Sequence, residues 1–147
     1  MSGGGSSDVT VGYKYYLGIH MVLCHGPIDN VSKIMVDGKT AWSGTAIGGA
    51  ITVSAKSLFG GEEREGGVSG TIDILMGEST QAKNSYLQSM LGTTIPAFRG
   101  VVSAVLNQVY VGLNPYLKPW SFRAQRTHKT TNGNTQWYDA KAQIGSD

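Results

Sequence analysis

The sequence has 147 residues and a single cysteine, Cys24, which excludes a framework of internal disulfides. It has no apolar run near the ~18 residues of a membrane-spanning helix, so we expect no membrane span. Its net charge is only +2, from 12 basic and 10 acidic residues, and no basic stripe indicates a nucleic-acid partner. The N-terminus lacks the basic and apolar regions of a secretory signal, and residues 1–7 are typical of a flexible Gly/Ser linker.

Residues 11–23 alternate between apolar and mostly small or polar side chains, and this period of two predicts a β-strand. At ~3.3 Å per residue the segment spans about 43 Å, well beyond the usual strand of about five or six residues. A strand of that length suits a scaffold or a barrel wall more than a compact enzyme. We expect its apolar face and residues of two later strands to be mostly buried: Tyr13, Tyr15, Leu17, Ile19, Met21, Ile72, Ile74, Val105 and Val109.

Turn residues divide the rest of the chain. Gly26-Pro27 ends the first strand, and Asp37-Gly38 predicts a type I′ hairpin between residues 31–36 and 40–42. Further strands are expected at residues 50–58, 68–76, 100–111 and 120–124. Residues 100–111 are apolar on both faces, which is typical of a strand buried on both sides.

One helix is expected at residues 81–91, with Ser79 or Thr80 as its N-cap and Gly92 just past its end. Three turns are marginally stable alone, so this helix needs a sheet to pack on. The fold class is therefore mostly β, an antiparallel barrel-like or sandwich domain with one packed α-helix. Residues 8–147 form a single domain, which we expect to be a fragment of a larger polypeptide.

Glycine is abundant, with 21 residues, and it concentrates in the charged loop at residues 59–67. Such a loop loses much backbone entropy when it is ordered, so we expect it to be mobile alone and to become ordered against a partner. The candidate interface residues in the loop are Phe59, Glu62, Glu63 and Arg64.

His20, Cys24 and His25 are the only close cluster of possible metal ligands. Zinc sites need three or four protein ligands, so packing roles are favoured over a metal site, and Cys24 is expected to be buried. Cys24 and His25 are adjacent and face apart on a strand, which disfavours a nucleophile–base pair. No phosphate-binding glycine pattern is present. We expect no enzyme activity, no cofactor and no metal.

Aromatic residues gather near prolines late in the chain. Tyr116, Trp120, Trp137 and Tyr138 are candidates for a contact surface for a sugar or a protein. Core packing is the default for Trp120, which alternates with polar neighbours. Tyr116 and Trp137 are therefore added to the candidate partner interface, and a module that binds carbohydrate or peptidoglycan through Tyr116, Trp120 and Trp137 is the alternative function.

Four motifs, taken in their order and spacing, resemble the large tail-tip or baseplate hub proteins of siphophages, the group of the tip attachment protein J. They are also similar to the hub protein of gene transfer agents. The motifs are Leu23-Cys24-His25-Gly26-Pro27, Val36-Asp37-Gly38-Lys39, Pro96-Ala97-Phe98-Arg99-Gly100 and Asn114-Pro115-Tyr116-Leu117-Lys118-Pro119-Trp120. The resemblance covers about residues 8–140.

The resemblance implies a structural role in a virion rather than catalysis. Hubs of this group are homotrimers that close the tail tube and contact neighbouring tail proteins. The chain is then expected at the phage tail tip, after synthesis in the cytoplasm of the bacterial host. Within the motifs, we expect the guanidinium of Arg99 to bond to the main chain or to Asp73 or Asp29, because an unpaired charge near a core is costly.

Overall fold

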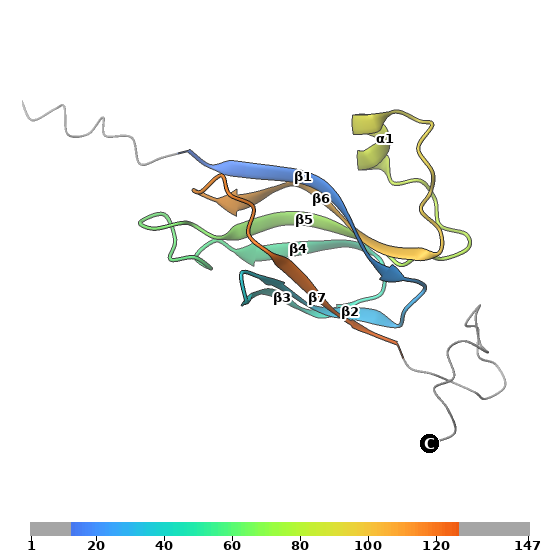
Figure 1. The fold of residues 1–147 in the computed structure, drawn as a ribbon, viewed down its shortest axis with the longest axis horizontal. Coiled ribbons are helices and arrows are strands. Elements are labelled where there is room, and N and C mark those ends of the chain that lie inside the picture. The colour runs from blue at the N-terminus through green and yellow to red at the C-terminus, as the bar shows by residue number, and fades with distance from the viewer. Residues whose placement is uncertain (1–12, 127–147) are drawn as a thin grey trace, which may run out of the picture.

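The computed structural model describes residues 13–126 of the chain. Its elements, in chain order, are β1 (Tyr15–His25), β2 (Asn30–Val36), β3 (Lys39–Ala46), β4 (Gly49–Ala55), β5 (Val68–Leu75), α1 (Ser85–Leu91), β6 (Val101–Gly112) and β7 (Trp120–Gln125). The strands form two antiparallel sheets, with the orders β1-β6-β5-β4 and β3-β2-β7 (Figure 1). The sheets form a sandwich and do not close into a barrel, so the prediction of a mostly β domain with one helix is confirmed in its sandwich form.

The core lies between the sheets and is dominated by branched aliphatic side chains. Its largest fully buried members include Ile34, Ile72, Ile74, Leu106 and Val109. In β6 the neighbours Val105 and Leu106 are both fully buried although they point to opposite faces, because one face meets the core and the other lies toward α1 (Figure 1). The predicted burial of this strand on both sides is confirmed.

The apolar face of β1 points inward as predicted, but it is only half-buried. Leu17, Ile19 and Met21 pack against the core cluster with part of their surface in water, because β1 is the edge strand of its sheet. The prediction for Tyr13 is wrong: it is 73% exposed, since β1 begins two residues later and no strand lies opposite it.

The hairpin at Asp37-Gly38 is present, with positive φ angles of 53° and 76° at the two residues, as a type I′ turn requires. The strand after it, β3, continues to Ala46, four residues beyond the segment at 40–42 that the sequence predicts. The Gly26-Pro27 turn follows directly on β1 and contains a cis peptide bond. A Cβ at Gly26 would come within 2.5 Å of the Met76 carbonyl oxygen, so this position has no room for a side chain.

The helix α1 ends before Gly92 as predicted, but it begins at Ser85, four residues later than predicted. Its N-cap is Asn84, whose side-chain oxygen accepts a hydrogen bond from the Leu87 amide at 3.0 Å. The Gln81 side chain bonds to the main chain of Gly77 and of Ala97, and these bonds hold the segment before Asn84 outside the helix. No helix in residues 13–126 is long and apolar enough to cross a membrane.

Candidate partner-binding site

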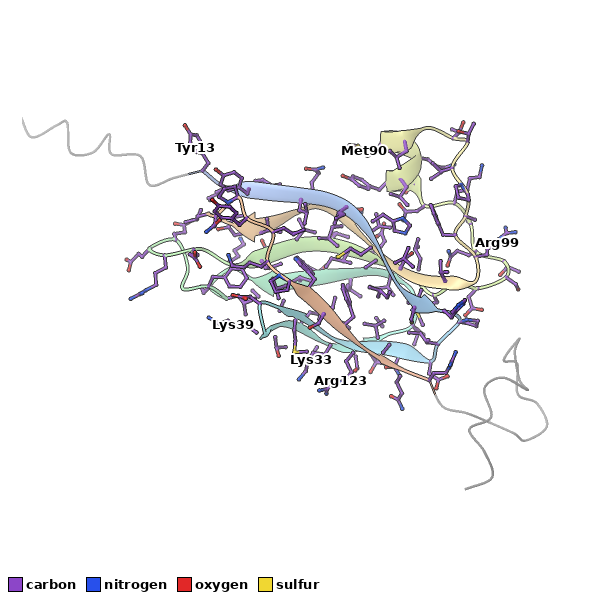
Figure 2. The ribbon with its side chains drawn as sticks, in the orientation of Figure 1. Tyr13, Lys33, Lys39, Met90, Arg99 and Arg123 are labelled. Atoms are coloured by element: carbon purple, nitrogen blue, oxygen red, sulfur yellow. The ribbon has the colours of Figure 1, made fainter. Side chains whose placement is uncertain are left out.

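Exposed apolar side chains gather at the end of the sandwich where β1 begins. Tyr16, Tyr116 and Leu117 are 57%, 79% and 63% exposed, and Tyr13 lies just before β1 (Figure 2). With Tyr15 and Trp120, these residues are here called the aromatic end. Large apolar side chains that cluster on a surface mark interaction sites more often than singly exposed ones do.

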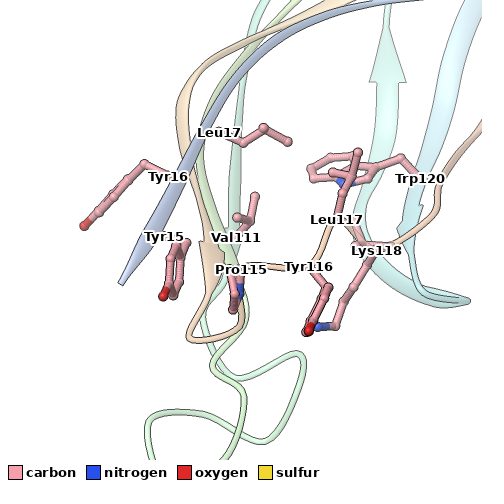
Figure 3. Close-up of a pocket in the computed structure, with 10 residues that line it drawn as sticks. Tyr15, Tyr16, Leu17, Val111, Pro115, Tyr116, Leu117, Lys118 and Trp120 are labelled. Atoms are coloured by element: carbon pink, nitrogen blue, oxygen red, sulfur yellow. The ribbon is translucent and has the colours of Figure 1, made fainter. Parts of the chain in front are cut away.

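A small pocket opens at the aromatic end between the two sheets. One wall comes from Tyr15 and Leu17 of β1, and the other from Trp120 of β7 and the loop that precedes it (Figure 3). Leu17 and Trp120 point toward each other across the pocket, whereas Tyr16 points away from it (Figure 3). The pocket has a volume of 80 Å³, far below the ~300–1,000 Å³ of typical small-molecule sites. A space of this size suits one apolar side chain of a partner.

The loop at residues 113–119, which forms the rim of this pocket, is held in place by the loop at residues 59–67. Glu65 in the loop at 59–67 accepts a hydrogen bond from Asn114 Nδ2 at 3.2 Å and lies 3.9 Å from Lys118 Nζ. The main-chain oxygen of Glu65 also accepts a bond from the Leu113 amide at 3.0 Å. Lys118 Nζ lies 4.7 Å from the ring centroid of Phe59, within cation–π range. The rim is therefore built as one unit from loops that are far apart in sequence.

Two glycines allow the loops to approach so closely. Gly66 has a φ of 80°, and a Cβ there would collide with the Tyr110 hydroxyl. Gly112 has a φ of 113°, and a Cβ there would lie 2.5 Å from the Glu65 carbonyl oxygen. Both positions combine a left-handed backbone with a close contact, so only glycine fits.

The loop at residues 59–67, which the sequence predicts to be mobile alone, is closed by main-chain hydrogen bonds of its own. The Phe59 amide donates to the Gly66 carbonyl at 2.8 Å, and Gly61 and Gly66 bond to each other in both directions. Phe59 is only 7% exposed and belongs to the core, so it offers little surface to a partner. The interface expectation is wrong for this residue because the loop folds back and places its ring under Lys118.

Four other predicted interface residues are exposed and can contact a partner: Glu62, Glu63, Arg64 and Tyr116. Glu62 also forms an ion pair with Lys14 at 3.4 Å. Trp137 and Tyr138 lie outside the described residues. Sequence reasoning missed Leu117 and Lys118 as pocket residues; the signal available for them was their position between two prolines in a loop that follows a buried strand.

Trp120 packs as its alternation with polar neighbours predicted. It is half-buried against the core, and its ring stacks near that of Phe122 with the centroids 6.4 Å apart. Only part of the indole surface is therefore open to a ligand.

The Pro96–Gly100 motif is organised by Gln81, which the sequence did not single out. The Gln81 side chain accepts from the Gly77 amide at 2.9 Å and donates to the Ala97 oxygen at 2.6 Å. Arg99 Nε donates to the Gln81 main-chain oxygen at 2.9 Å, which confirms the predicted main-chain partner for Arg99. Asp73, the alternative partner, instead accepts from two asparagine side chains, Asn84 and Asn107.

Among the residues weighed as metal ligands or nucleophiles, His20 lies apart from Cys24 and His25, which border one pocket. His20 contacts the Phe98 ring edge-on at 4.5 Å, and its buried Nε2 has no hydrogen-bond partner in residues 13–126. Burial lowers the pKa of His20. Within the same described part of the chain, no three His, Cys, Asp or Glu side chains converge as a metal site would require.

Cys24 is exposed, so the prediction that it is a buried packing residue is wrong. It lies near the end of the edge strand β1, where it borders a shallow pocket with Ile28, Ala124 and Arg126. Partial burial still raises the pKa of its thiol, and the positive charge of Arg126 acts in the opposite direction.

No protein-family model matches the chain, and no curated protein matches its sequence.

Proposed function

We propose that this chain is a structural module of a siphophage tail-tip or baseplate hub, and that the aromatic end contacts a neighbouring protein of the tail. In the parent hub the module takes part in a homotrimer at the end of the tail. The observation that carries the assembly role is the cluster of exposed Tyr16, Tyr116 and Leu117 around a pocket of side-chain size. The four motifs that resemble hub proteins support the assignment to a tail.

The construction of the aromatic end supports a role in assembly. Its rim is fixed by the bonds of Glu65 and by the contact of Lys118 with Phe59, so little entropy is lost when a partner binds. Aromatic side chains on a rigid frame are the usual anchors of protein interfaces. A single small interface of this kind needs further contacts from the parent assembly to be stable.

Binding of carbohydrate or peptidoglycan is the second candidate, and the exposed ring of Tyr116 favours it. Two features count against it. The pocket has only 80 Å³, and Trp120 is half-buried beside Phe122, so the two rings do not offer a broad stacking platform.

The proposal is tested by locating the protein in particles. Antibodies raised against the chain are applied, with gold labels, to phage-like particles purified from an induced culture of the source bacterium. We expect gold at one end of the tails. Particles with complete tails and no label would contradict the assignment.

The role of the aromatic end is tested in the parent gene. The double substitution Tyr116→Ser and Leu117→Ser should lower the yield of complete tails, whereas Ile47→Ser, at an equally exposed aliphatic residue elsewhere, should not. Sedimentation of the chain with purified peptidoglycan distinguishes the alternative. Binding that is lost in Tyr116→Ala would favour the glycan function over the structural one.

A further inference from the structure

The connection between β5 and β6 leaves the sheet and returns to it at one point. Gly77 and Gly100 stand at its two ends, with φ angles of 81° and 84°, and the Gly100 amide donates to the Gly77 oxygen at 2.8 Å. A Cβ at Gly77 would lie 2.6 Å from the Val101 oxygen, so the two ends pass too closely for a side chain there. Residues 78–99, which include α1, are here called the flap.

The flap is cross-linked within itself. The Gln81 side chain donates to the Ala97 oxygen at 2.6 Å, and Arg99 Nε donates to the Gln81 main-chain oxygen at 2.9 Å. Lys83 Nζ donates to the Thr93 oxygen at 2.7 Å. These bonds join the segment before α1 to the segment after it. They do not involve the sheet, so they can persist when the flap moves away from it.

The flap lies over the outer face of the sheet that contains β1, β6 and β5, with α1 above β1 and β6 (Figure 1). The register of the three strands places His20, Val105 and Asp73 in one row across this face. The flap contacts both ends of the row. Phe98 packs edge-on against His20 at 4.5 Å, and Asn84 Nδ2 donates to Asp73 Oδ2 at 2.9 Å. Val105, between them, is 0% exposed and therefore lies beneath the flap.

Little apolar surface holds the flap in place. Leu87 is the only buried residue of α1, and neither Leu87 nor Val105 belongs to the core cluster between the two sheets. Besides Asn84, the flap bonds to the sheet through the Tyr86 hydroxyl, which accepts from Gln108 Nε2 at 2.7 Å. Such hydrogen bonds add little net stability, because water offers equivalent partners once they break.

The closed position also carries costs of its own. Phe98 of the flap and Gln108 of the sheet, which both take part in the contact, have positive φ angles of 56° and 51°. This left-handed region is unfavourable for residues with a side chain. On the same face as Val105, the buried atoms His20 Nε2, Ser103 Oγ and Asn107 Oδ1 have no hydrogen-bond partner within residues 13–126. Opening lets water reach these atoms and relieves part of the cost.

We propose that the flap is a conformational device that opens as a unit, with Gly77 and Gly100 as its hinges, while the two sheets stay folded. Opening exposes Leu87 and Val105 and so creates an apolar surface that the closed chain does not offer. The inference goes beyond the proposed role in a phage tail and does not rest on it.

Two matched cysteine probes report the opening. Val105 and Ala104 are neighbours in β6 and are both 0% exposed, but Val105 lies beneath the flap and Ala104 belongs to the core cluster. Each is replaced by cysteine in the full chain, in which Cys24→Ser has removed the native thiol. With a thiol reagent at low concentration, labelling follows the population of the open form. We expect Val105→Cys to be labelled at least about tenfold faster than Ala104→Cys, because local opening needs less free energy than global unfolding.

A substitution in the core separates flap opening from global unfolding. Ile34 is fully buried in the opposite sheet. Ile34→Val destabilises the closed and open forms equally relative to the unfolded chain, so it should leave the labelling of Val105→Cys unchanged. The same change should raise the labelling of Ala104→Cys about two- to tenfold. Leu87→Ala weakens the closed form alone, so it should raise the labelling of both probes.

Three results would overturn the inference. Equal labelling of the two probes, or an equal response of both to Ile34→Val, would mean that Val105 is reached only by global unfolding. Labelling of Val105→Cys as fast as that of Cys24 in the native chain would mean that no closed flap exists in solution. If Val105→Cys does not fold, Ser103→Cys serves as the probe, because it is a nearly isosteric change at a fully buried residue of the same face.

Discussion

The two long sides of the sandwich are built differently. On one side the chain crosses directly from β3 to β4, with Gly48 and Gly49 at positive φ angles of 123° and 80° making the turn. Ala41 and Ala46 of β3 and Val53 of β4 are buried there. On the other long side, between β1 and β7 and here called the open side, no residue of either strand is buried.

The difference shows where the core is complete. A short covalent crossing holds two sheet edges together, so the side chains beneath it are buried. Within residues 13–126, the open side is bridged at one end by the connection at residues 26–29, where the Asp29 amide donates to the Gln125 oxygen at 2.8 Å, and at the other end by the loops that Glu65 joins. Between them, apolar side chains keep part of their surface in water, which is the property a binding surface needs.

The comparison is most strongly tested by truncating matched core residues. Ile34 is fully buried in the middle of its sheet, and Ile19 is half-buried at the open side. Ile34→Ala should lower the free energy of unfolding by about 2–5 kcal/mol, because it removes buried methyl groups and leaves a cavity. Ile19→Ala should cost about 1 kcal/mol, because less surface is returned to water and the site can relax.

Urea unfolding of the full chain and both variants measures this difference. The slope of the free energy with urea should stay the same in all three proteins, so that the midpoints report stability alone. Equal losses in the two variants would mean that Ile19 is covered in solution, and the contrast between the two sides would then be wrong.

Local patterns predicted much of this fold. Strict alternation located β1 and β5, and an Asp-Gly pair located the β2–β3 hairpin because few other residues adopt two consecutive positive φ angles. A glycine marked the end of α1 because it adopts a conformation that other residues avoid. Each of these signals acts within a few residues of chain and does not depend on the rest of the molecule.

The wrong predictions depend on contacts that are distant in sequence. The helix begins late because Gln81 bonds to Gly77 and to Ala97 in another loop. Phe59 is buried because a glycine-rich loop folds back beneath Lys118. The half-burial of β1 could not be predicted, because alternation identifies the apolar face of a strand but not its position at the edge of a sheet.

A smaller effect is expected on the outer face of β1, which α1 and the Phe98 loop cover near His20. Burial lowers the pKa of His20, so in the folded state it binds a proton less readily than the unfolded chain, whose pKa is near 6.5. The unfolded state is therefore favoured as the pH falls from about 6.5 toward the lower folded value. We expect the free energy of unfolding to fall in this window.

Urea midpoints measured at several pH values test this effect. The dependence should be weaker in His20→Leu and should persist in His25→Leu, whose histidine lies exposed near the end of the same strand. If removing His25 abolishes the dependence instead, the cover over His20 is not the cause.

The smallest effect concerns Cys24, at the pocket where the open side ends. Because the thiol is exposed, the folded chain should react with a thiol reagent without unfolding. Partial burial raises the pKa of this thiol, so the rate should keep increasing with pH beyond the range of an ordinary cysteine. The charge of Arg126 lowers the pKa of the thiol, so Arg126→Gln should reduce the rate at a fixed pH by reducing the thiolate fraction.

The control is Arg123→Gln, in β7 but outside this pocket, which should have less effect on the labelling rate. Labelling that becomes much faster in urea would show that Cys24 is shielded in the folded chain, and the open side would then end before this residue.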